Sequence, residues 1–303
     1  LSIRRQRQMC IRDRNYIGRF APTPSGPLHF GSLVAAVASY LDARANQGLW
    51  LVRIEDLDPP RTAPGSIDAI LSCLDIFGLH WDGEPMLQSQ RQPAYNEALE
   101  QLRQQGRIYA CSCSRAQFQA DPLYSCHCLT HPPPTIDVAL RTVMPQQSIT
   151  VDDVIIGPQT QHLANEVGDF VVQRKDQLFS YQLAVVVDDS EQNISHIIRG
   201  SDLYHQTPRQ VWLQACLGYK QPIYGHLPII TNNQGQKLSK QNLAAPLDMS
   251  QAPALLSEAL ERLGQATLCS FRQAPVEEQL AWAVEQWDIN SVPKQMQDPI
   301  AFV

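Results

Sequence analysis

Apolar residues recur at helical spacing near the start of the chain, and this pattern predicts the first elements of the fold. The periodic stretch begins at Phe30 and predicts a helix over residues 30–46. The segment NYIGRF (15–20) before it is typical of a strand, and so is LWLVRIED (49–56) after it, which is apolar enough to be buried. Strand, helix and strand in this order predict a β-α-β unit and a parallel sheet.

The rest of the chain continues with mixed elements. Helices are expected after Pro64, over about 91–105, and from about 203, where Val211, Trp212 and Ala215 would form the inner face. The segments ITVDDVI, DFVVQRKDQLFSYQLAVVVDD and ISHIIRG are typical of strands, with a turn at residues 175–177. Mostly helical sequence follows the loop GQKLSKQN (235–242). The pattern predicts an α/β nucleotide-binding fold, interrupted by an insertion and followed by a helical C-terminal region.

Composition narrows the class of protein. The 303 residues are 44% apolar, which allows a large core. The net charge of −6 argues against a protein that binds nucleic acid over most of its surface, although a local basic surface is still possible. No run reaches the ~18–20 apolar residues of a membrane helix, and no secretory signal is recognised, so we expect a cytoplasmic protein without membrane contact. Residues 1–14 are expected to be a disordered or non-native extension, with an amphipathic targeting helix as the alternative.

A loop rich in proline and glycine, RFAPTPSGPLHFGSL (19–33), joins the first strand to the first helix. This position in a parallel sheet favours ligand binding, and the helix N-terminus favours phosphate. Gly26 and Gly31 would let a ligand approach the backbone, and His29 could donate a hydrogen bond to a phosphate oxygen. The alternative for His29 is a capping or packing role. The loop is neither a Walker loop nor a GxGxxG motif.

Four of the eight cysteines cluster, in CSC (111–113) and YSCHC (124–128). Four soft ligands in two groups about a dozen residues apart fit tetrahedral Zn²⁺, and the alternative is a set of partly buried thiols. One metal site in a cytosolic protein is favoured over a disulfide scaffold, because the chain is long and well supplied with core residues.

A second loop, KLSK (237–240), would by itself be an ordinary solvated loop. Together, PSGPLHFGSL and KLSK resemble the HIGH and KMSKS signatures of the class I aminoacyl-tRNA synthetases, with Ser32, Leu238 and Gln241 as departures. The resemblance implies a Rossmann-like catalytic domain that binds ATP with Mg²⁺, and Lys237 and Lys240 that contact the leaving pyrophosphate. The implied catalytic residues are His29, Lys237 and Lys240, and the implied ATP-binding residues are Gly26, His29, Gly31, Ser32, Lys237 and Lys240.

Two further stretches, GRFAPTPSG and LVRIEDLD, are similar to the glutamyl branch of this class. Arg19 is suited to hold a carboxylate of glutamate, and Glu55 its ammonium group. SYQLAVVVDD and IIRGSDL also match, which implies substrate contacts at Tyr181 and Arg199. The alternatives are a strand core residue for Tyr181 and an ion pair between Arg199 and Asp202. The implied glutamate-binding residues are Arg19, Phe20, Ala21, Pro22, Thr23, Glu55, Tyr181 and Arg199.

The chain is most similar to the truncated members of the branch, the glutamyl-Q tRNA(Asp) synthetases, because only residues 241–303 follow Lys240. The resemblance implies that glutamate is activated with ATP without tRNA and then moved to the queuosine base at the wobble position of tRNA(Asp). No anticodon-binding domain is expected. The anticodon arm of tRNA(Asp) is the expected RNA partner, and the enzyme is expected to be a monomer. The alternatives are a truncated glutamyl-tRNA synthetase that charges the tRNA 3′ end and an inactive zinc-bearing RNA-binding module.

The resemblance also bears on the metal ligands and the domain boundaries. The family ligands correspond to Cys111, Cys113, Tyr124 and Cys128, while Cys126 is an alternative fourth ligand and His127 a third choice, for one structural Zn²⁺. The expected domains are a catalytic domain over 15–85 and 190–245, an inserted acceptor-like subdomain with the zinc site over 86–189, and a helical C-terminal region over 246–303.

Overall fold

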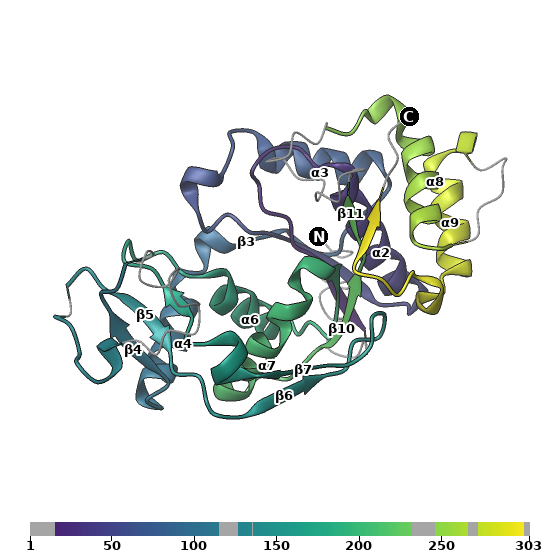
Figure 1. Cartoon of the computed structure of the whole chain (residues 1–303). Coiled ribbons are helices and arrows are strands. Elements are labelled where there is room, and N and C mark those ends of the chain that lie inside the picture. The colour runs from purple at the N-terminus through teal and green to yellow at the C-terminus, as the bar shows by residue number, and fades with distance from the viewer. Residues whose placement is uncertain (1–15, 115–126, 135, 232–245, 266–271, 300–303) are drawn as a thin grey trace, which may run out of the picture.

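The computed structural model describes residues 16–114, 127–134, 136–231, 246–265 and 272–299 (Figure 1). The expected extension over 1–14, the candidate metal ligands Tyr124 and Cys126, and the loop with Lys237 and Lys240 lie outside the described residues. Among the described residues, no helix combines the length and the apolar character that a membrane crossing needs.

Short strands and helices of about three turns make up the chain. The strands are β1 Ile17–Phe20, β2 Leu49–Ile54, β3 Met86–Leu87, β4 Ile108–Cys111, β5 Ala139–Thr142, β6 Ser148–Val151, β7 Gln159–His162, β8 Val171–Gln173, β9 His196–Gly200, β10 Ile223–Leu227, β11 Ile229–Thr231 and β12 Gln297–Pro299. The α-helices are α2 Phe30–Ala45, α3 Ser66–Ile76, α4 Gln92–Gln104, α6 Tyr181–Glu191, α7 Thr207–Leu217, α8 Ala252–Arg262 and α9 Val276–Gln286.

Parallel strands form the centre of the molecule, as the β-α-β pattern predicts. Strands β1, β2 and β3 pair in parallel, and β9 pairs in parallel with β10. The two groups meet where the Ser195 amide donates to the Ile17 carbonyl at 2.9 Å, so β9 lies beside β1. The insertion contributes the antiparallel sheet β4-β5-β8 and the hairpin β6-β7. The α/β fold class is therefore confirmed.

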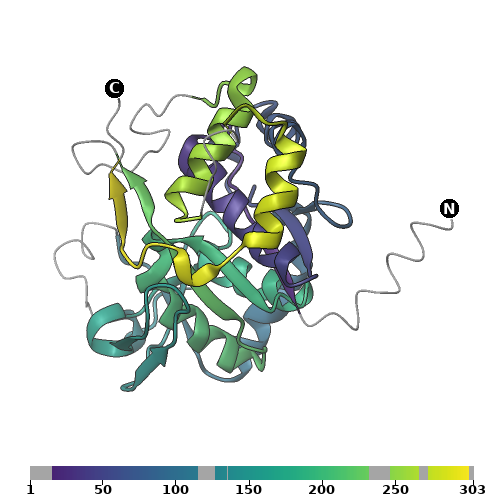
Figure 2. The same ribbon diagram turned by 90° about the vertical axis from the view of Figure 1, so that its right-hand side faces the viewer.

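Two apolar clusters divide the core. The first joins β1, β2, α2 and α3 to the C-terminal helices α8 and α9, which cover α2 (Figure 2). The second joins α4, β8 and α6, and it also includes Trp212 and Leu213 of α7. One cavity is lined from both clusters, by Phe20 and Leu28 of the first and by Tyr181, which packs against the second.

The expectation of a strand after the turn at residues 175–177 is wrong for the segment from Tyr181 to Glu191, because this segment forms helix α6. Every residue from Leu183 to Asp189 in this helix is buried. A helix buried on all sides shows no amphipathic period, and its run of β-branched residues then resembles a strand. Two smaller expectations also change: Ala215 of α7 is exposed, and α3 begins at Ser66, two residues after Pro64. The turn at residues 175–177 is confirmed.

The helical C-terminal region is confirmed and contains one element that its sequence does not predict. The indole of Trp287, after α9, donates to Asp42 of α2 at 2.8 Å. Strand β12 then pairs in parallel with β11, and the Ser201 hydroxyl donates to the Met296 carbonyl at 2.6 Å. The C-terminal segment therefore supports β11, whose residues Ile229 and Ile230 line the cavity.

Candidate active site and metal centre

A cavity of about 850 Å³ opens where β1, β2, β9 and β10 end and where α2 and α6 begin. Carboxyl ends of parallel strands and helix N-termini converge here, as expected for ligand sites in α/β folds. Most of the residues that the sequence predicts as contacts line this cavity together. They are Arg19, Phe20, Ala21, Pro22, Thr23, His29, Gly31, Ser32, Glu55, Tyr181 and Arg199.

Gly26 is the one described member of the predicted set that does not line the cavity. Its φ of 138° is a backbone conformation that favours glycine, so it serves the course of the loop. Gly31 does line the cavity, and a Cβ there would lie 3.3 Å from the His29 ring. Gly26 therefore shapes the loop, whereas Gly31 leaves space in the cavity beside the His29 ring.

His29 combines the two roles that its sequence context allows. It is the N-cap of α2, where its Nδ1 accepts from the Ser32 amide at 3.2 Å, and it also lines the cavity. With Nδ1 as acceptor, the neutral ring carries its proton on Nε2, which lies 3.1 Å from the Ser32 hydroxyl. The capping bond thus orients an N–H donor beside the positive end of a helix, where an anion is favoured.

Arg199 lies at the end of β9 with only 5% of its surface exposed. Its Nε donates to His226 Nε2 at 3.0 Å, and its Nη1 donates to the Tyr181 hydroxyl at 3.3 Å. Nη2 donates to Thr207 and Gln210 at 3.0 and 2.8 Å. These partners are neutral, so the positive charge at the cavity wall is held in place without a carboxylate to neutralise it.

This network replaces the two alternatives suggested by local sequence. Tyr181 is the first residue of helix α6, lines the cavity and is not a strand residue. Burial raises the pKa of its phenol, so the group stays protonated and can donate. Arg199 bonds to four other residues and does not pair with Asp202, which lines the same cavity.

Behind Arg199, His226 is fully buried in strand β10. Its Nδ1 lies 2.6 Å from Asp153 Oδ2, which fixes Nε2 as the atom that accepts from Arg199. Burial lowers the pKa of His226 to about 4, against the opposing effect of Asp153, so the ring is neutral at physiological pH. A neutral histidine can accept this hydrogen bond, whereas an imidazolium would repel the guanidinium.

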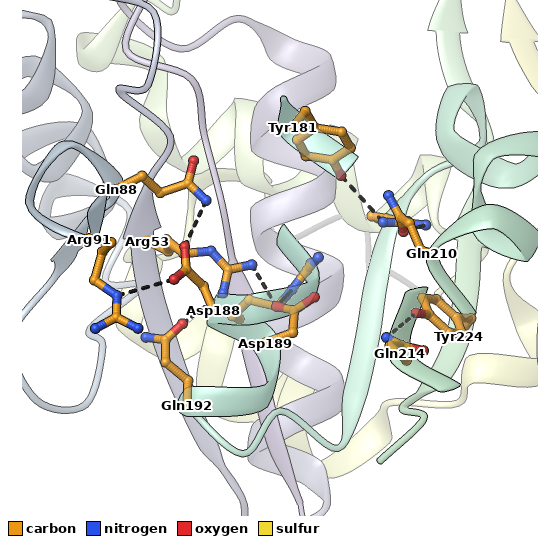
Figure 3. Close-up of polar contacts among 12 residues, drawn as sticks. Arg53, Gln88, Arg91, Tyr181, Asp188, Asp189, Gln192, Gln210, Gln214 and Tyr224 are labelled. Carbon is orange, nitrogen blue, oxygen red and sulfur yellow. Dashed lines mark hydrogen bonds and ion pairs between the residues drawn. The ribbon is translucent and has the colours of Figure 1, made fainter. Parts of the chain in front are cut away.

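Arg19 at the other end of the cavity wall is fixed by an ion pair that bridges two strands. Asp189 of α6 accepts from Arg19 Nε at 3.2 Å and from Arg53 Nη2 at 2.5 Å. All three side chains are buried. Burial opposes ionisation of Asp189, but the two guanidinium groups outweigh it and lower the pKa of this carboxyl. Figure 3 shows Arg53 and Asp189 facing one another.

Glu55 follows β2 and faces the cavity. No hydrogen bond among the described residues involves its carboxylate. Burial raises the pKa of this group to about 7, although Arg53, Arg19 and Arg199 act in the opposite direction. A half-buried carboxylate with a raised pKa and an open cavity beside it is a typical binding or catalytic group. Its chemistry suits a cationic ligand group that supplies the missing positive charge.

Several functional side chains escape prediction from the sequence. Asp189, His226 and Asp153 orient the cavity residues from behind, and Asp202 and Gln206 line the cavity itself. Asp202 and Gln206 follow Arg199 closely, so the motif IIRGSDL already pointed to their neighbourhood. The other three are separated from their partners by long stretches of sequence; Asp189 ends the motif SYQLAVVVDD, but nothing in that motif indicates its pairing with Arg19 and Arg53.

Three of the predicted metal ligands are brought together. The ligand atoms of Cys111, Cys113 and Cys128 lie within 4.8 Å of one another, and the Sγ atoms of Cys113 and Cys128 are 3.6 Å apart. Cys111 ends β4 and Cys128 lies in a short helical turn, and both are buried. His127 is not part of this group; its ring stacks on His131 with centroids 4.1 Å apart. This group of three cysteines can hold a metal ion.

Comparisons with known proteins agree with this geometry. A family model for the catalytic domain of class I tRNA synthetases for E and Q matches residues 17–122 and 134–266. The glutamyl-Q tRNA(Asp) synthetase of Pseudomonas aeruginosa is 50% identical over 281 residues, which cover 92% of this chain and 96% of that protein. The chain belongs to the glutamyl-Q tRNA(Asp) synthetase family. The member from Thiobacillus denitrificans is also 50% identical, over 91% of this chain and 95% of its own length.

Solved structures place the family in the same fold. The glutamate-tRNA synthetase of Elizabethkingia anophelis matches with a TM-score of 0.79 and 25% identity, over 95% of this chain and 68% of that one. This glutamyl-Q tRNA(Asp) synthetase family member is therefore a class I synthetase-like ligase, which confirms the resemblance stated from its motifs.

Replacing Asp189 by Asn should strongly destabilise this family member. The substitution keeps the shape of the side chain but leaves Arg19 and Arg53 as buried charges without a counter-charge. We expect the free energy of unfolding to fall by about 3–5 kcal/mol in urea titrations. Asp176→Asn is the matched control, because Asp176 pairs with Arg174 at 2.6 Å in an exposed position, where a loss below about 1 kcal/mol is expected. Equal losses in the two variants would contradict this account of the core.

Proposed function

We propose that the chain activates glutamate with ATP, without tRNA, and transfers it to the queuosine base at the wobble position of tRNA(Asp). The observation that carries this proposal is the 50% identity, over 92% of the chain, to a protein named glutamyl-Q tRNA(Asp) synthetase. The geometry of the cavity supports it, because two buried arginines face the same space as a carboxylate that bonds to none of the described side chains. Glutamate carries the complementary charges, two carboxylates and one ammonium group.

The amino acid is held by charges fixed in advance. We infer that Arg19 and Arg199 bind carboxylate oxygen atoms and that Glu55 binds the ammonium group, with Tyr181 beside it. Neither arginine side chain has to be immobilised when glutamate binds, because Asp189 already fixes Arg19 and His226 already fixes Arg199. Groups held before binding lose little entropy when the ligand arrives, so the fixed geometry contributes to affinity and to the orientation of the reacting carboxylate.

ATP is placed against the N-terminus of α2. His29, Gly31 and Ser32 would face its phosphates, and Lys237 and Lys240 would stabilise the pyrophosphate. A glutamate carboxylate oxygen attacks the α-phosphorus, the bond to the pyrophosphate oxygen breaks, and glutamyl-adenylate forms. An acceptor group of queuosine then attacks the adenylate carbonyl, and AMP leaves. ATP brings its own Mg²⁺. The residues act by position and charge, which are large terms in phosphoryl transfer.

The cluster of three cysteines fits one structural Zn²⁺. A tetrahedral site with zinc–sulfur bonds of ~2.3 Å places sulfur atoms roughly 3.8 Å apart, close to the 3.6 Å between Cys113 and Cys128. We propose Cys111, Cys113 and Cys128 as ligands, with Tyr124 as the fourth and Cys126 as its rival. Four protein ligands leave no position for substrate, so the metal would hold the insertion together.

Two assays test the function. Exchange of pyrophosphate into ATP should depend on glutamate and proceed without tRNA. Labelled glutamate should then appear on an anticodon stem-loop of tRNA(Asp) that carries queuosine, and not on the same stem-loop with guanosine at that position. The stem-loop lacks the 3′ acceptor end, so labelling cannot come from ordinary charging. Transfer to the 3′ end of full tRNA alone would replace this function with that of a truncated glutamyl-tRNA synthetase, and absent exchange would exclude both.

The pKa of Glu55 predicts how glutamate binding depends on pH. Because burial raises this pKa to about 7, the carboxyl favours the fold while protonated, and that contribution is lost as the pH rises through about 7. The ammonium group of glutamate needs the ionised form. The dissociation constant should therefore fall by roughly tenfold between pH 6 and pH 8, in calorimetric titrations. Glu55→Gln should bind weakly without this dependence; an unchanged pH profile in the variant would exclude Glu55.

Metal analysis tests the zinc site. The protein purified with zinc should contain about one ion per chain, and Cys128→Ser should lower that content by removing a buried ligand. Glutamate-dependent exchange should change by less than about threefold, because the cluster is not among the residues lining the cavity. Cys216→Ser, in α7 and outside the cluster, is the control and should keep full metal content. Full zinc in both variants would leave the cluster without its proposed role.

A further inference from the structure

A buried carboxylate of the insertion lies behind the cavity wall. Asp153 comes shortly after β6, is 6% exposed and is not among the residues that line the cavity. Its backbone forms a parallel bridge with Tyr224 of β10, and the Val154 amide donates to the Tyr224 carbonyl at 2.9 Å. The loop after β6 is therefore attached to β10, the strand that carries His226.

The two oxygen atoms of Asp153 have separate partners. Oδ1 accepts from the backbone amides of Ile155, Ile156 and His226 at 3.0, 2.9 and 3.2 Å. Oδ2 lies 2.6 Å from Nδ1 of the His226 ring. Burial opposes ionisation of Asp153, but the hydrogen bonds from His226 and the two isoleucine amides outweigh it and lower the pKa of this carboxyl. Because an ionised carboxylate only accepts, the proton of the neutral ring lies on Nδ1.

The other ring nitrogen faces the arginine of the cavity wall. His226 Nε2 accepts from Arg199 Nε at 3.0 Å and lies 3.3 Å from the Thr207 hydroxyl oxygen. Thr207 donates its own hydroxyl proton to the Leu203 carbonyl at 3.2 Å, so its oxygen could accept from a protonated Nε2. The opposite tautomer of His226 would therefore find a partner in Thr207, but it would turn an N–H toward the N–H of Arg199. The carboxylate of Asp153 is the group that excludes this tautomer.

We propose that Asp153 and His226 are positioning residues for glutamate, which fix the tautomer that directs Arg199 into the cavity. The inference rests on the proposed function, in which Arg199 binds a carboxylate of glutamate, and it extends the amino-acid site into the insertion. Without an acceptor behind it, Arg199 keeps only the hydrogen bonds made by Nη1 and Nη2. The guanidinium plane is then free to tilt, and the affinity for glutamate falls.

Asp153→Asn changes the tautomer and keeps the loop. The three backbone amides require an oxygen atom at the Oδ1 position, so the side-chain NH2 group of the variant faces His226 and donates to Nδ1. Nε2 then carries the proton and repels Arg199. In glutamate-dependent pyrophosphate exchange, the KM for glutamate should rise at least about tenfold, because a hydrogen bond to a charged group is lost. The kcat and the KM for ATP should change far less. Asp152→Asn, an exposed neighbour, is the matched control and should change none of these values.

Two variants of His226 separate a positioning role from a structural one. The amide of His226→Gln reaches about as far as Nε2 and keeps an acceptor for Arg199, but it gives up the bond to Asp153. The amide of His226→Asn reaches about as far as Nδ1, so it keeps the bond to Asp153 and loses the acceptor. The KM for glutamate should rise at least about tenfold in His226→Asn and by less than about threefold in His226→Gln. A residue that only supports the fold through Asp153 would give the reverse order.

The tautomer also predicts a rescue. In the His226→Gln background no ring proton can move, so the addition of Asp153→Asn should change the KM for glutamate by less than about twofold. A full tenfold rise in that background, an unchanged KM in Asp153→Asn alone, or the reverse order of the two His226 variants overturns the inference. Thermal unfolding shows that each variant is folded, and where Asp153→Asn is not, the two His226 variants decide. Absence of glutamate-dependent exchange in the unmodified protein overturns the proposed function instead.

Discussion

Two neighbouring carboxylates on a buried helix hold the halves of this fold together. Asp189 faces β1 and β2 and pairs with Arg19 and Arg53, while Asp188 accepts from Gln88, Arg91 and Tyr95 of the segment around α4. Buried charges are tolerated when every one is paired, and removal of one partner leaves the others in an apolar medium. Helix α6 is thus fixed in both directions, and the cavity that begins at its N-terminus inherits that geometry.

The same arrangement explains how the cavity keeps its own charges unneutralised. Asp189 and the neutral His226 hold the guanidinium groups from behind, so the edges that face the cavity stay available. Glu55 gains the opposite character, since it is buried beside cations but bonded to none of the described side chains. A site for a zwitterion needs this separation, because direct pairing of Glu55 with either arginine would remove both binding groups at once.

Much of the fold was predictable from local pattern, and its exceptions have a common cause. The helix over 30–46 and the two flanking strands were correct because each buries one face or follows a clear period. Helix α6 was missed because its burial on all faces erases the period, and tertiary packing then overrides the β propensity of its valines. Strand β12 was missed because three residues with few apolar side chains become a strand only through pairing with β11.

For the site, the sequence reveals residues that touch the cavity and conceals those behind them. His29, Glu55 and Arg199 belong to compact motifs, and the cavity unites them. Their supports, and the Gln88 side chain, are defined by bonds between distant segments; Gln88 and Asp188 are 100 residues apart in the chain. No period or spacing encodes such a bond. The cysteine group lies between these cases, because its spacing predicted a metal site, while only the fold brings Cys111, Cys113 and Cys128 together.

The bond between Arg19 and Asp189 also has a consequence for how the chain folds. Their separation of 170 residues means that the first strand emerges from the ribosome long before its counter-charge exists. Loop closure over such a distance is slow, and contacts of this kind form late. The antiparallel hairpins of the insertion close over short distances and can form first. The nascent enzyme should therefore acquire its peripheral sheets early and its binding site last, in one step that brings α6 against β1.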